Sequence, residues 1–283
     1  MPTVTDMFVL PVRIVLTAFG FLQFGIQVLW LGKWQMPRLI SAGDDRTTQR
    51  QQALYTAHRH VEFYLKTLDV LGLVKLHFEG TPSQEPCVLA ANHPGLLDFI
   101  VILKDFPNAA CLYKSQSLDN PVLSSFVQIA GYIEGMDGTT VASKRIIAAC
   151  CERLKEGRHI AIFPEGTRSQ SATEVRKFRS TGFHVAIKSG VAVQPVAIYY
   201  RPLLLGKGQR WSTFCRQTSH ITIRYLDPLL PEEGQTAANL AEATKTRICT
   251  ALAIMESTAL PSLTENFSGK ASAAPGPDTP PEL

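Results

Sequence analysis

The sequence predicts an α/β domain in which a mixed, largely parallel sheet is flanked by helices, preceded by N-terminal helices that associate with a membrane. Short apolar runs of strand length alternate with longer stretches of helical periodicity from residue 73 onward. The most apolar stretch of the chain, residues 8–31, comes before them. Two polar motifs follow two of the apolar runs, which is where open α/β sheets bind ligands.

The composition suits a folded protein at a membrane. The 283 residues are 45% apolar and 18% charged, which allows one domain with a large core and is too little charge for disorder. The net charge of +4 gives no reason to expect nucleic acid as a partner. It suits an anionic bilayer, where a basic residue near the surface contributes about 1 kcal/mol.

The apolar stretch 8–31 is long enough to span a bilayer, for which about 20 residues suffice. Its polar residues Arg13, Gln23 and Gln27 cost more free energy the deeper they lie, so a shallow or re-entrant anchor fits as well as a full span. A buried core helix is the alternative. The expected location is the cytoplasmic face of the inner or plasma membrane, because aromatic and basic residues that suit that interface lie at the end of the stretch and just after it: Trp30, Lys33, Trp34 and Arg38.

The other elements follow in chain order. Residues 47–73 have apolar side chains at helical spacing and predict a long helix that packs under the anchor or on the domain after it. Strands are expected at 73–79, 88–91, 110–114, 131–134, 159–163, 192–199 and 220–225. Helices are expected at 95–106, 121–130, 140–156, 180–189 and 236–258. We therefore divide the chain into an anchoring region (1–72), a main domain (73–262) and a disordered tail (263–283).

The first polar motif, residues 92–98, offers a base with an orienting acid. On an unbroken helix His93 and Asp98 would lie about 140° apart, because successive residues advance by about 100°. Pro94 and Gly95 remove this objection, since the chain can turn after His93 and begin a helix that brings Asp98 back to the imidazole. This geometry suits a His-Asp dyad.

The second polar motif, residues 163–169, suits a phosphate group. Gly166 lets the backbone approach a phosphate, Thr167 can donate a hydrogen bond, and Arg168 can bind two phosphate oxygens at once. Glu165 would repel a phosphate, so it is expected to bind a substrate hydroxyl or to orient Arg168, with a purely structural salt bridge as the alternative. Basic residues that either add charge to the site or form a solvated face follow at Arg176, Lys177 and Arg179.

These two blocks and the run 191–198 come in the order found in the PlsC-type glycerolipid acyltransferases, the 1-acyl-glycerol-3-phosphate acyltransferases. The chain resembles that family over residues 75–225, most specifically in the Glu-Gly-Thr-Arg sequence of 165–168. The resemblance implies the glycerol-3-phosphate acyltransferase-like fold, with residues 73–262 as the catalytic domain. It also implies transfer of a fatty acyl group from a thioester of acyl carrier protein (acyl-ACP) or coenzyme A (acyl-CoA) to the hydroxyl of a lysophospholipid, with no bound cofactor.

The chemistry of acyl transfer assigns roles to the two blocks. A neutral imidazole can take the proton of an alcohol as the C–O bond forms, which is the role expected of His93. Asp98 would fix the tautomer of the ring and stabilise the imidazolium. No metal site is predicted, and the cysteines are expected to be reduced. The candidate substrate-binding residues are Asn92, Gly95, Glu165, Gly166, Thr167, Arg168, Lys177 and Arg179.

The chain departs from the family pattern at residues 131–138. Many members carry Gly-x-Ile-x-x-x-Arg there, and the arginine is implicated in holding the acceptor phosphate. This chain has no arginine in that stretch and carries Glu134 and Asp137 instead. The acceptor is therefore open between lysophosphatidate and a different lysolipid, of the ornithine type or the aryl-polyene type. A non-catalytic membrane protein that retains the fold is the other alternative.

Overall fold

A seven-stranded sheet forms the centre of the molecule, with strand order β1-β7-β6-β2-β5-β3-β4. The computed structural model describes residues 4–41, 45–113, 121–135, 140–209 and 217–259. All seven predicted strands are confirmed, although the last residue predicted for the third, Lys114, lies outside the described residues. They are β1 (Val74–Glu79), β2 (Val88–Ala91), β3 (Ala110–Tyr113), β4 (Ile133–Glu134), β5 (Ile160–Ile162), β6 (Val193–Arg201) and β7 (Ser219–Tyr225).

The sheet is mixed and largely parallel, as predicted. Strands β6, β2, β5, β3 and β4 run in the same direction. β7 is antiparallel to β6, and the edge strand β1 is parallel to β7. The carboxyl ends of the neighbouring strands β2 and β5 therefore meet at one edge, so the residues that follow them are brought together.

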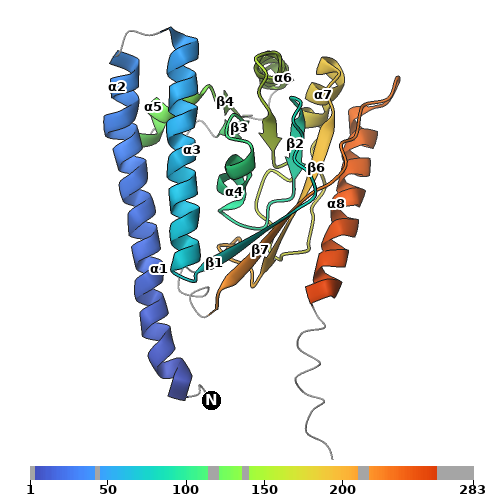
Figure 1. The fold of residues 1–283 in the computed structure, drawn as a ribbon. Coiled ribbons are helices and arrows are strands. Elements are labelled where there is room, and N and C mark those ends of the chain that lie inside the picture. Colours follow the sequence, from blue (N-terminus) through green and yellow to red (C-terminus); the bar gives the residue numbers. More distant parts are fainter. Residues whose placement is uncertain (1–3, 42–44, 114–120, 136–139, 210–216, 260–283) are drawn as a thin grey trace, which may run out of the picture.

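Helices cover both faces of the sheet (Figure 1). One face is covered by α6 (Thr140–Lys155), α7 (Thr181–Ser189) and α8 (Ala237–Ala259). The other is covered by α3 (Arg46–Val70) and α4 (Asp98–Asp105), with α5 (Pro121–Ala130) beside α3. Because both faces are covered, the central strands β2 and β5 are buried along their whole length.

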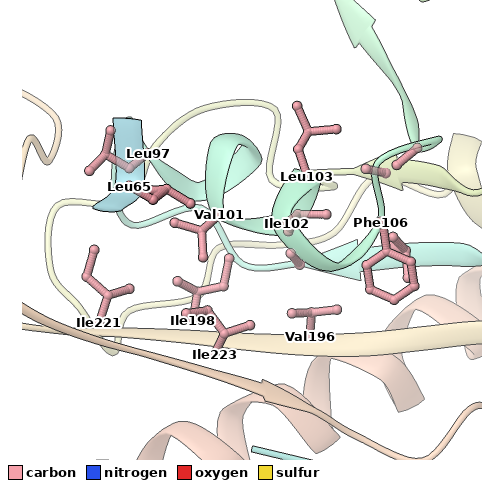
Figure 2. Close-up of a cluster of buried hydrophobic side chains, with 14 of the residues drawn as sticks. Leu65, Leu97, Val101, Ile102, Leu103, Phe106, Val196, Ile198, Ile221 and Ile223 are labelled. Carbon is pink, nitrogen blue, oxygen red and sulfur yellow. The ribbon is translucent and has the colours of Figure 1, made fainter. Parts of the chain in front are cut away.

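The core on the α3 and α4 side positions the first polar motif (Figure 2). Val101 and Ile102 of α4 pack on Ile198 of β6 and on β7. They are 0% exposed, so the helix that begins at Asp98 is fixed to the sheet by its apolar side chains. Each such side chain contributes about 1.5–3 kcal/mol when fully buried.

Helix α3 begins one residue before the predicted start and ends three residues before the predicted end. Asp45 caps it, because its Oδ1 accepts hydrogen bonds from the backbone N–H groups of Thr47 and Thr48 at 2.7 and 3.1 Å. The helix ends before Gly72, which adopts a positive φ of 64°. Figure 1 shows α3 between α1 and the rest of the domain, so it packs both under the N-terminal segment and on the domain.

The N-terminal segment is one long rod with two sides. It consists of α1 (Val4–Trp30), a π-helical turn η1 (Leu31–Gln35) and α2 (Met36–Ser41). Residues 10–41 are long and apolar enough to cross a membrane. One side packs on the domain: Thr17 is buried, and a Cβ on Gly20 would lie 3.3 Å from Leu68. The opposite side exposes an apolar stripe made of Val12, Val15, Phe19, Leu22, Ile26, Leu29, Trp30, Trp34 and Ile40.

Candidate active site

The predicted His-Asp dyad is present in the structure. Nδ1 of His93 lies 2.7 Å from Oδ2 of Asp98. The chain turns at Pro94 and Gly95, α4 begins at Asp98 itself, and the backbone N–H of Gly95 donates to the same carboxylate oxygen at 2.9 Å. Asp98 is 0% exposed, whereas the side chain of His93 keeps 22% of its surface. The Asp98 carboxylate is therefore internal, and the His93 imidazole is partly exposed.

Tyr200 is a member of this site that the sequence did not reveal. Its hydroxyl donates to Oδ1 of Asp98 at 2.5 Å from strand β6, which lies 102 residues further along the chain. Burial raises the pKa of Asp98, while the hydrogen bonds from His93, Tyr200 and Gly95 lower it. Both oxygens of the carboxylate thus have donors, which hold it in one orientation toward the imidazole.

Gly95 has a steric role that differs from the predicted substrate contact. It is buried, and a Cβ at this position would lie 2.7 Å from the ring and the hydroxyl of Tyr200. Only glycine therefore allows Tyr200 to reach Asp98.

Asn92 is likewise a positioning residue. Its Nδ2 donates to the carbonyl of Ile198 at 2.9 Å, and its Oδ1 accepts from the N–H of the same residue at 2.8 Å. The side chain is buried, so the predicted contact with substrate is not supported. Asn92 joins the end of β2 to β6 and so fixes the point from which the turn at His93 leaves the sheet.

The structure does not support the expectation that Glu165 binds a substrate hydroxyl or orients Arg168. Glu165 contacts neither Arg168 nor the open side of the cleft, and it is 5% exposed. Oε1 accepts the backbone N–H of His93 at 2.9 Å, while Oε2 accepts from Ser169 Oγ at 2.9 Å and from the N–H of Arg176 at 3.0 Å. The carboxylate therefore ties the first block to the second. The sequence shows that residue 165 is charged, but the charge alone does not indicate that this side chain is buried.

The second block lies against His93. Phe163 stacks on the imidazole of His93, with ring centroids 4.3 Å apart. The N–H of Ser169 donates to the carbonyl of His93 at 2.7 Å. Together with Glu165, these contacts fix the ring and the backbone of His93.

Two of the predicted cations reach the site. Arg168 donates to the carbonyl of Leu205 at 2.7 Å, and Arg179 packs over Gly166. Gly166 has a φ of 71°, and a Cβ on it would lie 2.9 Å from the guanidinium carbon of Arg179. Arg168, Arg179, Gly166 and Thr167 all line the cleft beside His93, whereas the exposed side chain of Lys177 does not.

The cleft has a volume of about 570 Å³ and joins polar and apolar walls. Next to it lies an apolar cavity of about 300 Å³ between α1, α3, α4 and α5. Phe99, Cys111 and Tyr113 line both spaces. A ligand with a polar head and a long apolar tail could therefore place the head beside His93 and the tail between the helices.

The structure places one of the two acidic residues, Glu134 and Asp137, by which the stretch 131–138 departs from the family pattern. Glu134 lies 3.5 Å from Arg145, and it is not among the residues that line the cleft. Asp137 and Lys114 lie outside the described residues. No group of three or more potential metal ligands occurs in the described ranges, and Cys87, Cys111, Cys150, Cys151 and Cys249 are free thiols.

Comparison with known proteins points to one family. A family model described as "Acyltransferase" matches residues 73–199. The chloroplastic 1-acyl-sn-glycerol-3-phosphate acyltransferase of Arabidopsis thaliana is 26% identical over 50% of this chain and 40% of its own length. The lyso-ornithine lipid O-acyltransferase of Pseudomonas aeruginosa is 27% identical over 79% of this chain and 87% of its own length.

A solved structure shows the same fold. The 1-acyl-sn-glycerophosphate acyltransferase PlsC of Thermotoga maritima superposes with a TM-score of 0.69 and 20% identity, over 92% of this chain and 98% of the other. The chain spans less than half of the length of the Arabidopsis relative. The matched region contains both halves of the dyad and the Glu-Gly-Thr-Arg sequence. Residues 73–199 therefore match the acyltransferase family model, and over this region the chain is similar to the PlsC-type glycerolipid acyltransferases.

Proposed function

We propose that this protein transfers a fatty acyl group from an acyl thioester to the free hydroxyl of a lysolipid, with lysophosphatidate as the first candidate acceptor. One observation carries the proposal: His93 lines an open cleft while its Nδ1 is held 2.7 Å from the buried carboxylate of Asp98. Nε2 is then the ring nitrogen offered to a substrate hydroxyl. This is the arrangement required of a general base.

The reaction needs no covalent enzyme intermediate. Nε2 of His93 takes the proton as the hydroxyl oxygen attacks the thioester carbonyl, and Asp98 stabilises the imidazolium that forms. The tetrahedral intermediate then collapses with loss of the thiolate. The imidazolium returns its proton to the sulfur, which gives the ester and the free thiol. In this mechanism Tyr200 and Gly95 keep Asp98 in place.

The donor is proposed to be acyl-ACP or acyl-CoA, used as a co-substrate. The apolar cavity beside the cleft is suited to the acyl chain, because Phe99 and Tyr113 continue from one space into the other. Removing a methylene group from water contributes about 0.8 kcal/mol, so a chain in this cavity gains affinity with its length until the cavity is full.

A phosphorylated acceptor suits the basic wall. Arg168 and Arg179 line the cleft together with Gly166 and Thr167, and Arg179 packs over Gly166. Guanidinium groups bind phosphate oxygens in pairs, which fixes the orientation of the headgroup as well as its position.

A lyso-ornithine lipid is the second candidate acceptor. The stretch 131–138 lacks the arginine that many members of the family carry. The Pseudomonas aeruginosa relative named for that lipid also aligns over most of both chains. A zwitterionic headgroup needs less positive charge than a phosphomonoester, which agrees with the missing arginine.

The apolar stripe of α1, η1 and α2 is proposed to hold the protein in the membrane interface. A transmembrane helix is apolar on all sides, whereas this rod is apolar outward and fixed to the domain inward, where Arg13 donates to the carbonyl of Gly72 at 3.2 Å. Stacking of Trp30 on Trp34, with Arg38 5.2 Å from the ring centroid of Trp34, suits the headgroup region. Attachment at the cytoplasmic side is part of this proposal.

The test is acyl transfer from labelled palmitoyl-ACP and palmitoyl-CoA to lysophosphatidate and to lyso-ornithine lipid in mixed micelles. His93→Ala is expected to lower the rate by a factor of about 10² to 10⁴. His220→Ala, which removes an exposed histidine outside the cleft, serves as the matched control. Equal rates for the parent and His93→Ala with every donor and acceptor would favour a non-catalytic protein.

A further inference from the structure

Three arginines meet over Gly131, away from the active site. Arg50 comes from α3, Arg153 from the last turn of α6, and Arg158 from the loop before β5. A Cβ on Gly131 would lie 3.0 Å from Nε of Arg50, 3.1 Å from Nη1 of Arg158 and 3.2 Å from Nε of Arg153. Gly131 has a φ of 64°, so both its backbone and the space above it require glycine. None of these residues lines the catalytic cleft.

This arginine cluster, Arg50, Arg153 and Arg158, has more positive than negative charge. Glu156 accepts from Nη1 of Arg50 and from Nη1 of Arg153, both at 2.8 Å. It is the single carboxylate within 4 Å of any of the three in the described part of the chain. Three guanidinium groups thus share one counter-ion.

Arg158 is the member with unused donors. It is 4% exposed, and its Nε donates to the carbonyl of Asn108 at 2.9 Å. Its Nη1 and Nη2 and the Nε of Arg50 are buried and have no partner among the described residues. Burial, and then the neighbouring Arg50, lower the pKa of Arg158 to about 10, so the group remains charged at neutral pH. A buried charge with unpaired donors is costly unless an anion accompanies it.

A purely structural role explains part of the arrangement. Arg153 donates from Nε to the carbonyl of Gly131 at 3.0 Å, and this carbonyl follows the C-terminus of α5. Arg158 similarly donates a hydrogen bond from Nε to the backbone carbonyl of Asn108. Neither contact uses the terminal nitrogens of Arg158, and neither balances the second and third positive charges.

We infer that the arginine cluster is a binding site for a phosphate-like oxyanion. An anion with three or four oxygens can accept from three guanidinium groups at once, which a carboxylate with two oxygens cannot match. Access is from the side of Arg50 and Glu156, whose side chains keep 25% and 38% of their surface. The anion would add to or replace Glu156 as the counter-ion.

The position of the arginine cluster suggests two sources for the phosphate. Arg50 follows Gln49, whose side chain donates to the carbonyl of Ile40 in α2 at 3.3 Å. The cluster therefore lies at the end of α3 that is next to α2, which carries Ile40 of the apolar stripe and the basic residue Arg38. A phosphate in this place belongs either to the headgroup of a membrane lipid or to a free phosphate compound in solution.

The experiment measures phosphate binding to the full chain, in a background with Arg168→Gln and Arg179→Gln so that the catalytic cleft does not contribute. Titration calorimetry with inorganic phosphate is compared for Arg50→Gln, Arg158→Gln and the control Arg145→Gln, an exposed arginine of α6 that pairs with Glu134. Loss of one charged hydrogen-bond donor is expected to weaken binding about tenfold at Arg50 or Arg158. Arg145→Gln is expected to leave it unchanged.

Glu156→Gln is expected to change the phosphate affinity in the opposite direction. Removal of the competing carboxylate is expected to tighten phosphate binding severalfold, and phosphate should restore the thermal stability that this variant loses. Cosedimentation with phosphatidylglycerol and phosphatidylcholine vesicles distinguishes the two sources of phosphate. If the site binds a lipid headgroup, the protein binds the anionic vesicles more strongly, and this preference depends on Arg50. If the site binds a soluble phosphate compound, inorganic phosphate binds but the preference for anionic vesicles does not depend on Arg50. Unchanged phosphate affinity in both Arg50→Gln and Glu156→Gln, or equal loss in Arg145→Gln, would overturn the proposal even if Arg158→Gln does not fold.

Discussion

The backbone N–H of His93 donates to the carboxylate of Glu165 at 2.9 Å, across 72 residues of chain. The same carboxylate binds Ser169 and the backbone of Arg176. His93 and the turn at residues 163–169 are therefore parts of one hydrogen-bonded unit. This relationship explains why an acidic residue lies in a motif that otherwise suits an anion.

Glu165→Gln is expected to reduce stability and turnover together. A glutamine offers one acceptor oxygen where three donors now converge, so at least one buried donor loses its partner at a cost of about 1–3 kcal/mol. Thermal unfolding and kcat measure the two effects. Glu174→Gln, an exposed change nearby, is the control. A variant with normal stability and kcat but a raised KM for the acceptor would instead indicate a direct substrate contact.

Tyr200→Phe is expected to move the acid limb of kcat/KM to higher pH. The hydroxyl of Tyr200 lowers the pKa of Asp98, so its removal raises that pKa and the carboxylate is protonated at a higher pH than in the parent. The pH profile of both proteins tests this. Tyr199→Phe, at the neighbouring position of β6, should leave the profile unchanged. A shift toward lower pH would contradict the assignment.

Gly166→Ala is expected to weaken binding of the acceptor as well as the fold. A side chain in the left-handed region costs about 1–2 kcal/mol, and here the new Cβ also meets the guanidinium of Arg179. Gly190→Ala carries the same backbone strain at a φ of 64° with open space around it. Both variants should lose stability, and Gly166→Ala alone should raise the KM for the acceptor. Equal KM values in the two would show that Arg179 does not bind it.

Protonation of His159 is expected to make the protein less stable in mild acid. Burial lowers the pKa of His159 to about 4, so between about pH 6.5 and 4 the unfolded chain binds a proton that the folded protein does not. Stability is therefore retained above about pH 6.5 and falls by up to about 3 kcal/mol on the way to pH 4. Urea unfolding against pH measures this, and His159→Gln should flatten the curve. His184→Gln, on the exposed face of α7, should not.

Charges in the apolar stripe are expected to weaken membrane binding. Phe19→Glu with Leu22→Glu removes two side chains that would each contribute about 1.5–3 kcal/mol in an apolar environment, so vesicle binding should fall more than tenfold. Leu230→Glu changes an exposed leucine outside the stripe and serves as the control. Flotation with liposomes provides the measurement. Unchanged flotation of the double variant would place the membrane contact elsewhere.

Local signals in the sequence predicted most of the fold and the centre of the site. The strands were short apolar runs between breakers, and His93 and Asp98 are five residues apart with a Pro-Gly turn between them, so their meeting depends on local chain geometry. Each of the two polar motifs follows a predicted strand, which indicated that these strands, β2 and β5, lie close together in the sheet.

The rest depended on tertiary packing that no local pattern contains. Tyr200 reaches Asp98 because β6 lies next to β2, and Asn92 pairs with Ile198 for the same reason. Glu165 was misread because burial of a charge depends on which donors surround it in space. The π-helical turn at residues 31–35 likewise left no periodicity that separates it from an ordinary helix.

The close packing of α1 on the domain fixes how far the candidate site lies from the membrane, in addition to attaching the domain to α1. Gly20 lies against Leu68 and Leu73, and Arg13 holds the carbonyl of Gly72, so the rod has no free hinge relative to the sheet. With the apolar stripe in the interface, the distance from the bilayer surface to His93 is then set by the fold rather than by a tether. Lysolipids would be selected by how far their hydroxyl projects from the acyl region, in addition to their charge.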